Sequence, residues 1–223
     1  VRWLITGANG FLGANASRVL GAHSEVVGLT RSGGSLPWCG NVVRGDLLDP
    51  ASLARALDEA QPDIVLNCAG LADHHACARD EELANRINGK AAGELTGLAS
   101  QAGCRMMHIS TDAVFSGKYG WRAEDDEKDP NTAYGRSKAR GEEAVLDRDA
   151  DAVVMRTNFF GWSPSGQRSS LEFFVRELSA GHRVPGFVNY TVTSLFIEDV
   201  VTSIERIVES GESGVFHVVA RDA

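Results

Sequence analysis

Short apolar runs alternate with amphipathic stretches along the first 160 residues of the chain. The runs have the usual length of β-strands. The stretches between them repeat apolar residues at the 3.6-residue period of a helix. The pattern predicts strands at 1–5, 25–30, 41–44, 63–67, 104–110 and 152–156, and helices at 11–20, 51–60, 81–102 and 130–145.

This alternation predicts an α/β fold, a Rossmann-type doubly wound parallel sheet. The run at 63–67 is almost wholly apolar, as in a strand that is buried on both faces. The pattern changes after residue 160, where the expected elements are a polar loop at 162–168, a helix at 171–180, a strand at 184–193, a helix at 197–209 and a strand at 215–219.

Composition and charge exclude several classes of protein. Of the 223 residues, 43% are hydrophobic and 23% are charged, which is typical of a folded domain. The net charge of −8 argues against a nucleic-acid partner, because clustered Lys and Arg bind phosphate backbones. No apolar run approaches the roughly twenty residues that span a bilayer, and no signal segment is recognisable, so we expect a cytoplasmic protein without membrane contact.

No metal site is expected. The four cysteines show no CxxC pairing, and the acidic residues between 124 and 129 are bunched as in a solvated loop. The ends of the sequence carry a separate expectation. Val1 already lies in the first predicted strand and Ala223 directly follows the last one, so we expect residues to be missing from both ends.

Three regularly spaced glycines separate the first strand from the first helix. Glycine permits a tight turn, lets the backbone approach a pyrophosphate and allows the helix to pack close to the sheet. The GxxGxxG spacing predicts a dinucleotide site, with an ordinary glycine turn as the alternative. The residues expected to bind the cofactor here are Gly7, Asn9, Gly10, Phe11, Leu12 and Gly13.

The end of the second predicted strand indicates which dinucleotide is bound. Proteins that prefer NAD place an acidic residue there to accept a hydrogen bond from the ribose 2′-OH. This chain has Arg31 and Ser32 instead, which could hold a 2′-phosphate. NADPH is therefore the favoured cofactor, and NADH is the alternative. For Arg31 itself, the alternative role is a solvated cation in a loop that binds no cofactor.

Two further strand ends carry candidate cofactor contacts. Asp46, followed by Leu47, could accept a hydrogen bond from an adenine amino group, and helix capping near Asp49 is the alternative. After the fourth strand, small residues would let a nicotinamide ribose lie against the backbone. These are Cys68, Ala69 and Gly70.

Tyr134 and Lys138 are four residues apart on one face of a predicted helix. An ammonium near a phenol lowers the pKa of the phenol toward neutrality, which suits a proton donor to a reduced carbonyl. The alternative is a chance pair on a solvated helix. The preceding strand ends at Thr111, where the chemistry of an open α/β sheet is placed, and this favours the catalytic interpretation.

Four segments together resemble the extended short-chain dehydrogenase/reductases, and within them the branch of the dTDP-4-dehydrorhamnose reductases. The resemblance covers residues 1 to about 219 and is carried by the glycine motif, by His108–Phe115 (HISTDAVF), by Tyr134–Lys138 (YGRSK) and by Met155–Thr157 (MRT). It implies a dinucleotide-binding domain at 1–160 and a small substrate lobe at 161–223, incomplete in this chain, with 191–219 returning to pack on the sheet.

The resemblance also implies roles for individual residues. Thr111 would hydrogen-bond the substrate carbonyl, Tyr134 would deliver the proton, and Lys138 would hold the cofactor ribose and keep the phenol acidic. The implied substrate contacts are Ser110, Thr111, Asp112, Asn158 and Phe159, with Arg168 and Arg183 as weaker candidates in the lobe.

The chain departs from the reductase branch at two of these positions. Ala113 stands where the branch usually has Tyr after its Ser-Thr-Asp motif, which would remove a sugar contact. Phe159 corresponds to a substrate-stacking Trp, so an aromatic face is kept and an N–H donor is lost.

The sequence therefore predicts an enzyme, an NAD(P)-dependent oxidoreductase that reduces a 4-keto group on a nucleotide-activated deoxysugar. One alternative is a nucleotide-sugar epimerase or dehydratase of the same fold. Another is a non-catalytic NADP-binding regulatory subunit, like the partner of methionine adenosyltransferase. A homodimer is compatible with the sequence.

Overall fold

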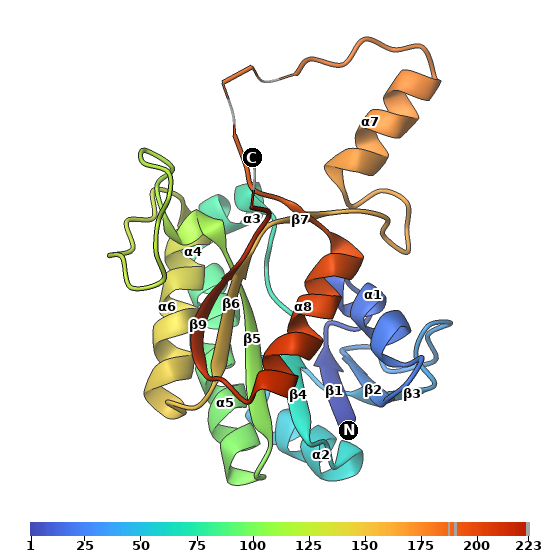
Figure 1. The fold of residues 1–223 in the computed structure, drawn as a ribbon. Helices are drawn as coiled ribbons and strands as arrows, with labels where there is room; N and C mark the ends of the chain where they lie inside the picture. Colours follow the sequence, from blue (N-terminus) through green and yellow to red (C-terminus); the bar gives the residue numbers. More distant parts are fainter. Residues whose placement is uncertain (187, 190, 222–223) are drawn as a thin grey trace.

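A computed structural model describes residues 1–186, 188–189 and 191–221. Its centre is a seven-stranded sheet in the order β3-β2-β1-β4-β5-β6-β9, in which every neighbouring pair is parallel (Figure 1). The strands are β1 (Arg2–Thr6), β2 (Glu25–Thr30), β3 (Asn41–Arg44), β4 (Ile64–Asn67), β5 (Arg105–Thr111), β6 (Val153–Thr157) and β9 (Gly214–Val218). The doubly wound α/β prediction is confirmed, and the order in which strands are added to the sheet reverses between β1 and β4.

Helices cover both faces of the sheet (Figure 1). Along β1, Leu4 faces one apolar core and its neighbours Trp3 and Ile5 face the other. The first core is covered by α2 (Pro50–Ala60), α5 (Ala91–Gln101) and α6 (Ala133–Arg148), and the second by α1 (Phe11–Leu20) and α8 (Ile197–Ser210). Because both faces are buried, polar side chains are concentrated where the strands end.

The helix predicted at 81–102 is continuous but not uniform. It comprises α4 (Glu81–Ala84), a π-helical segment η1 (Asn85–Lys90) and α5. A short helix that the sequence analysis missed, α3 (His74–Arg79), precedes it, and the Asp73 carboxylate accepts the Ala76 N–H at 2.8 Å to cap it. Half of the six residues of α3 are polar and the helix is short, so its apolar periodicity is weak.

The helix predicted from residue 130 begins three residues later, as α6. Thr132 is its N-cap, and the Thr132 hydroxyl accepts the Gly135 N–H at 3.0 Å. A 3-10 turn, η2 (Asp112–Val114), follows β5 directly. None of the described helices has the length and apolarity that crossing a membrane would require.

The C-terminal part contributes to the sheet and also leaves it. β9 pairs with β6, while β7 (Phe159–Phe160) and β8 (Leu195–Phe196) form a separate two-stranded sheet. The strand predicted at 184–193 is wrong for 184–186, 188–189 and 191–193, which form no strand, and 187 and 190 lie outside the described residues. Among the described residues of this segment, the β-branched side chains pair with no neighbouring strand.

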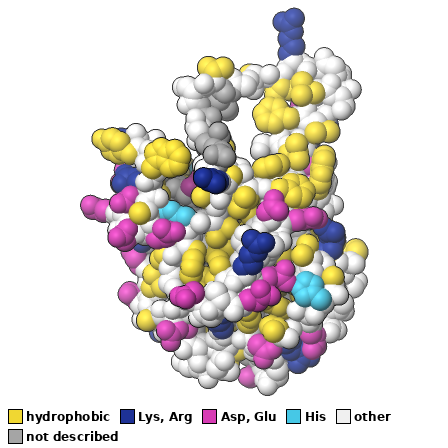
Figure 2. Space-filling model, in the orientation of Figure 1, with side chains coloured by type: hydrophobic (Ala, Val, Ile, Leu, Met, Phe, Trp, Pro, Cys, Tyr) yellow, Lys and Arg dark blue, Asp and Glu magenta, His cyan; other side chains and the backbone are white. Residues whose placement is uncertain are grey.

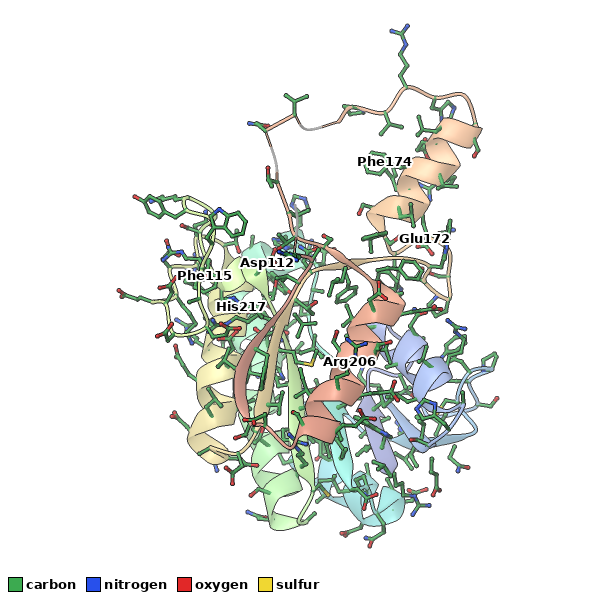
Figure 3. All side chains as sticks on the ribbon, in the orientation of Figure 1. Asp112, Phe115, Glu172, Phe174, Arg206 and His217 are labelled. Atoms are coloured by element: carbon green, nitrogen blue, oxygen red, sulfur yellow. The ribbon has the colours of Figure 1, made fainter. Side chains whose placement is uncertain are left out.

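Helix α7 (Ser170–Ser179) stands away from the sheet (Figures 1 and 3). A reciprocal pair of hydrogen bonds between Ser169 and Glu172 caps its first turn, which stabilises a helix that has few neighbours. Its apolar side chains are 40–60% exposed and form part of the hydrophobic surface in Figure 2; they are Phe173, Phe174, Val175 and Leu178.

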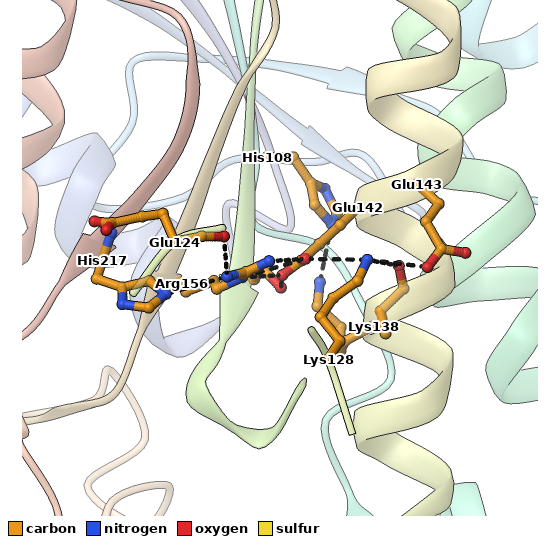
Figure 4. Close-up of polar contacts among 10 residues, drawn as sticks. His108, Glu124, Lys128, Lys138, Glu142, Glu143, Arg156 and His217 are labelled. Atoms are coloured by element: carbon orange, nitrogen blue, oxygen red, sulfur yellow. Dashed lines mark hydrogen bonds and ion pairs between the residues drawn. The ribbon is translucent and has the colours of Figure 1, made fainter. Parts of the chain in front are cut away.

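A buried ion pair joins three elements of the domain (Figure 4). Arg156 of β6 donates to Glu142 of α6 through Nη2 at 2.8 Å and through Nε at 3.0 Å, and the two side chains are only 5% and 1% exposed. Ser110 of β5 donates to the same carboxylate at 2.5 Å. Arg156 Nη1 also donates to the Glu124 carbonyl at 3.0 Å, so the pair holds the loop between β5 and α6.

Replacing Arg156 should destabilise the fold strongly. Arg156→Met keeps most of the apolar stem but leaves Glu142 buried without its principal cation, which should cost about 3 kcal/mol of unfolding free energy. The control is Arg176→Met, which breaks an exposed pair with Glu177 and should cost less than about 1 kcal/mol. Equilibrium urea unfolding measures both values, and equal losses would contradict a stabilising role for the buried pair.

Candidate active site

The glycine motif forms a tight turn between β1 and α1. Gly7 has φ +64°, and the Gly10 N–H donates to its carbonyl oxygen at 2.7 Å. A Cβ atom at Gly13 would lie 2.3 Å from that same oxygen, and one at Gly10 would lie 2.9 Å from it. Side chains at these positions would therefore collide with the Gly7 carbonyl and force the turn to change shape.

The start of α1 fits an anion. The N-cap residue of α1 is Gly10, and no side chain among the described residues makes a capping hydrogen bond to the first turn. That turn also contains no acidic residue. The N–H groups of Phe11 and Leu12 lie in this turn, where the helix dipole favours negative charge. The Leu12 side chain is buried in the core, so only its backbone can serve a cofactor. Asn9 is exposed beside the turn.

The residues expected around the 2′-phosphate and adenine lie at the ends of β2 and β3. Arg31 and Ser32 are exposed, and the Arg31 backbone carbonyl accepts a hydrogen bond from Arg44 Nε at 3.1 Å. Trp38, which sequence reasoning missed, donates through Nε1 to the Ala8 carbonyl at 2.8 Å and so ties this loop to the glycine turn.

Asp46 is half-buried at the end of β3. One carboxylate oxygen accepts the Leu48 N–H at 2.9 Å. The cap of α2 is Asp49, which accepts the Ala51 N–H at 3.1 Å, so the capping alternative belongs to Asp49 and not to Asp46. The side chain of Leu47 packs in the core, so it can offer only its backbone to a cofactor.

The small residues after β4 lie against the glycine turn. A Cβ at Gly7 would be 3.0 Å from Ala69 Cα, so the two backbones are in close contact. Cys68 lies beside them, and burial raises the pKa of its thiol to about 12, which keeps the thiol protonated. Gly70, at the end of this stretch, is exposed.

Thr111, Asp112 and Asn158 meet at the ends of β5 and β6. The Thr111 hydroxyl donates to Asp112 Oδ1 at 3.0 Å, and Asn158 Nδ2 donates to Asp112 Oδ2 at 3.1 Å (Figure 3 labels Asp112). Ser194, next to β8, donates to Asn158 Oδ1 at 2.7 Å. Ser110 points to Glu142 instead, because neighbouring strand residues face opposite sides of the sheet, so its side chain does not join this group.

Tyr134 lies in the first turn of α6, beside Thr111. Burial raises the pKa of Tyr134 to about 12, although a hydrogen bond with the Thr111 side chain lowers it in part. The His74 ring packs against the phenol, with 4.6 Å between ring centroids. The place of His74 beside the phenol could not be recognised from the sequence, because α3 was not predicted.

Lys138 is bound to residues of β5 in this structure. Its Nζ donates to the Ile109 carbonyl at 2.6 Å and lies 3.1 Å from His108 Nε2. Burial lowers the pKa of Lys138 to about 8. The expectation that Lys138 brings the pKa of Tyr134 toward neutrality is therefore wrong for this arrangement, because desolvation of the phenol outweighs the favourable contacts.

The remaining candidates lie on the C-terminal side of the site. The rings of Phe159 and Phe11 pack edge to face, 5.4 Å apart, which joins β7 to the start of α1. Arg168 Nη1 donates to the Asn9 carbonyl at 3.5 Å, so it reaches the glycine turn. Arg183 is exposed after α7.

Comparison of the sequence with known protein families identifies the family of this chain. Residues 1–223 match the family model described as the RmlD substrate binding domain. The chain belongs to that family. The recognition of a reductase branch from its motifs is thus confirmed, and the family assignment covers the full sequence.

Two relatives of this chain are named as reductases. The chain is 35% identical to the probable low-salt glycan biosynthesis reductase Agl14 of Haloferax volcanii, over 98% of the chain and 74% of that protein. It is 30% identical to the dTDP-4-dehydrorhamnose reductase of Mycobacterium tuberculosis, over 96% of the chain and 67% of that enzyme.

Solved structures share the fold of this family member. A hypothetical dTDP-4-dehydrorhamnose reductase from Sulfolobus tokodaii has a TM-score of 0.88 at 28% identity, and the match covers 100% of the chain and 78% of that structure. The Bordetella bronchiseptica enzyme WbmG, in complex with NAD and UDP, has a TM-score of 0.82 at 25% identity, covering 98% and 72%.

Gly13→Ala should weaken NADPH binding by about tenfold or more, because the added Cβ would push the Gly7 carbonyl out of the turn that faces the phosphates. The matched control is Gly97→Ala in α5, where the nearest atom to an added Cβ is 3.8 Å away on the flexible Arg148 side chain. Fluorescence titration with NADPH measures both affinities. Unchanged binding in Gly13→Ala would show that the turn does not hold the cofactor.

Proposed function

We propose that this protein is an NADPH-dependent reductase of a 4-keto group on a nucleotide-activated deoxysugar. The observation that carries the proposal is the position of Tyr134 in the first turn of α6, which packs against the turn directly after Thr111 at the carboxyl end of the sheet: a Cβ at Gly135 would lie 2.1 Å from the Ala113 carbonyl oxygen. The glycine turn after β1 lies at the same end of the sheet and fits a pyrophosphate. Membership of a family whose named relatives reduce dTDP-linked keto sugars supports it.

The cofactor would be held along the ends of β1 to β4. The glycine turn and the start of α1 would bind the pyrophosphate, Arg31 and Ser32 the 2′-phosphate, and Asp46 the adenine. The backbone from Cys68 to Gly70 would lie against the nicotinamide ribose, whose hydroxyls Lys138 would bind. When bound, the nicotinamide supplies the hydride.

The chain's own residues would handle the proton. With its pKa raised to about 12, Tyr134 carries its proton across the physiological range and can donate it to the carbonyl oxygen as that oxygen gains charge. The Thr111 hydroxyl would hydrogen-bond the same oxygen. Hydrogen bonds that strengthen as the alkoxide develops lower the barrier selectively.

The sugar and its nucleotide would lie on the side of Asp112, Asn158 and Phe159. Asp112 and Asn158 are bonded to each other, so their polar groups are held in fixed positions near the carbonyl site. The segment from 161 to 190 would contribute to the substrate lobe, and 191–219 would belong with the dinucleotide domain. The proposed location is the cytoplasm.

The assembly we propose is a homodimer. The apolar side chains exposed on α7 are compatible with it. Light scattering coupled to gel filtration measures the mass directly.

Tyr134→Phe should lower kcat by about 10²–10⁴-fold, because it removes the proton donor and leaves the ring in place. NADPH affinity should stay at the value of the unmodified protein. The measurement is NADPH consumption against a panel of nucleotide 4-keto-6-deoxysugars, with Tyr119→Phe, an exposed tyrosine, as the control. Full turnover in Tyr134→Phe would refute the assignment, and NADPH binding without consumption of any sugar would favour a regulatory role.

Arg31→Ala should raise the Kd for NADPH by about tenfold and leave the Kd for NADH nearly unchanged, since only NADPH carries the 2′-phosphate. Arg55→Ala, an exposed arginine on α2, is the control and should change neither value. Parallel titrations with the two cofactors make the comparison. Equal effects on both would assign Arg31 to the solvated loop.

A further inference from the structure

A row of buried polar side chains ends at Lys138. Of the residues in this row, the chemistry proposed above uses only Lys138. Thr6 ends β1, Asn67 ends β4, and His108 lies within β5. Their exposed fractions are 0%, 1% and 1%, and that of Lys138 is 6%. Buried polar groups of this kind are costly unless each one is hydrogen-bonded, so the bonds they make define how each must be oriented.

The row has a direction that is set at its far end. The Ala69 N–H donates to Thr6 Oγ1 at 3.0 Å, and the Thr6 hydroxyl donates its own hydrogen to Asn67 Oδ1 at 2.6 Å. This contact fixes the Asn67 amide with its nitrogen toward His108. Asn67 Nδ2 lies 3.0 Å from His108 Nδ1 and can only donate to it.

The tautomer of His108 follows from that bond. Burial, together with the nearby Lys138 charge, holds the pKa of His108 well below its usual value, so the ring is neutral. A neutral imidazole that accepts at Nδ1 carries its hydrogen on Nε2. That hydrogen points at Lys138 Nζ, 3.1 Å away, and can bond to it only if the amine has a free lone pair.

We propose that Thr6, Asn67 and His108 are positioning residues, which together direct the Nε2–H of His108 at Lys138 and thereby favour its uncharged amine. The other contacts of Lys138 agree with an amine at this position. One of its hydrogens bonds the Ile109 carbonyl at 2.6 Å, and the Cys68 thiol beside it is protonated. Glu142 and Cys68 both act to raise the pKa of Lys138, and burial outweighs them. Arg156 already pairs with Glu142 (Figure 4).

The consequence for catalysis rests on the proposed reductase. Above a pH of about 8, where Lys138 is an uncharged amine, no cation from this side chain acts on the Tyr134 phenol, and the phenol keeps its proton. Below a pH of about 8 Lys138 gains a proton, its N–H then opposes the Nε2–H of His108, and the row must rearrange. The charge of Lys138, and with it the acidity of the phenol, is in this way coupled to the orientation of Asn67.

The first experiment reads the tautomer without cofactor or sugar. Long-range ¹H–¹⁵N correlation spectra of the histidine rings distinguish the two nitrogens, and His108→Gln identifies the His108 signals by their loss. At a pH one unit above the Lys138 pKa, we expect His108 with its hydrogen on Nε2. A hydrogen on Nδ1 would overturn the proposal.

The second experiment removes the group that sets the direction. Thr6→Val leaves the Asn67 amide free to turn, and His108 can then accept a hydrogen bond from the Lys138 ammonium. The pKa of Lys138, measured as the pH midpoint of NADPH binding, should therefore rise by about one unit. Thr6→Ser keeps the hydroxyl and should retain the original midpoint. Thr96→Val, which removes an equally buried hydroxyl that bonds only the Ala92 carbonyl within α5, should also leave it unchanged.

An unchanged midpoint in Thr6→Val would overturn the proposal, as would an equal shift in Thr6→Ser. If Thr6→Val fails to fold, the tautomer of His108 measured on the unmodified protein tests the proposal. Neither experiment requires turnover, so failure of the protein to reduce any keto sugar would refute the reductase and leave these two results interpretable.

Discussion

A parallel sheet that is buried on both faces can place polar chemistry only where its strands end. In this protein the alternation of Trp3, Leu4 and Ile5 between two cores leaves no exposed face on β1. The carboxyl ends of β1, β4, β5 and β6 therefore collect the glycine turn, the small residues after Asn67, and Thr111. The site lies at this edge because helices cover both faces of the sheet.

Burial also decides the charges within the site. Desolvation acts in opposite directions on the two principal groups, raising the pKa of Tyr134 to about 12 and lowering that of Lys138 to about 8. Both shifts favour the uncharged form of the group. A spacing of four residues on a helix suggests an ion pair of ammonium and phenolate, but burial opposes the charge of each group and most strongly disfavours the phenolate.

Much of the architecture could be predicted from the sequence, because local patterns determine it. The first six strands follow from short apolar runs, and the glycine turn follows from residue type and spacing. The strand expected at 184–193 failed because apolar and β-branched residues form a strand only beside another one. No local signal shows whether that neighbour exists.

Only part of the site, likewise, could be predicted from the sequence. Thr111, Tyr134 and Lys138 could be named from a strand end and a helix spacing, and their individual roles stay predictions. The row from Thr6 to His108 could not be found, because its members are 61 and 41 residues apart and meet only through the pairing of β1, β4 and β5.

The ion pair of Arg156 and Glu142 has an evolutionary consequence. Ser110, the immediate neighbour of Thr111, donates to Glu142, which also lies one turn beyond Lys138 on α6. The residues that stabilise the fold are thus attached to the residues proposed to handle the proton. Selection cannot tune one without the other, so descendants of this sequence should diversify their sugar preference through the segment after β6, where few such ties exist, and conserve the pair itself.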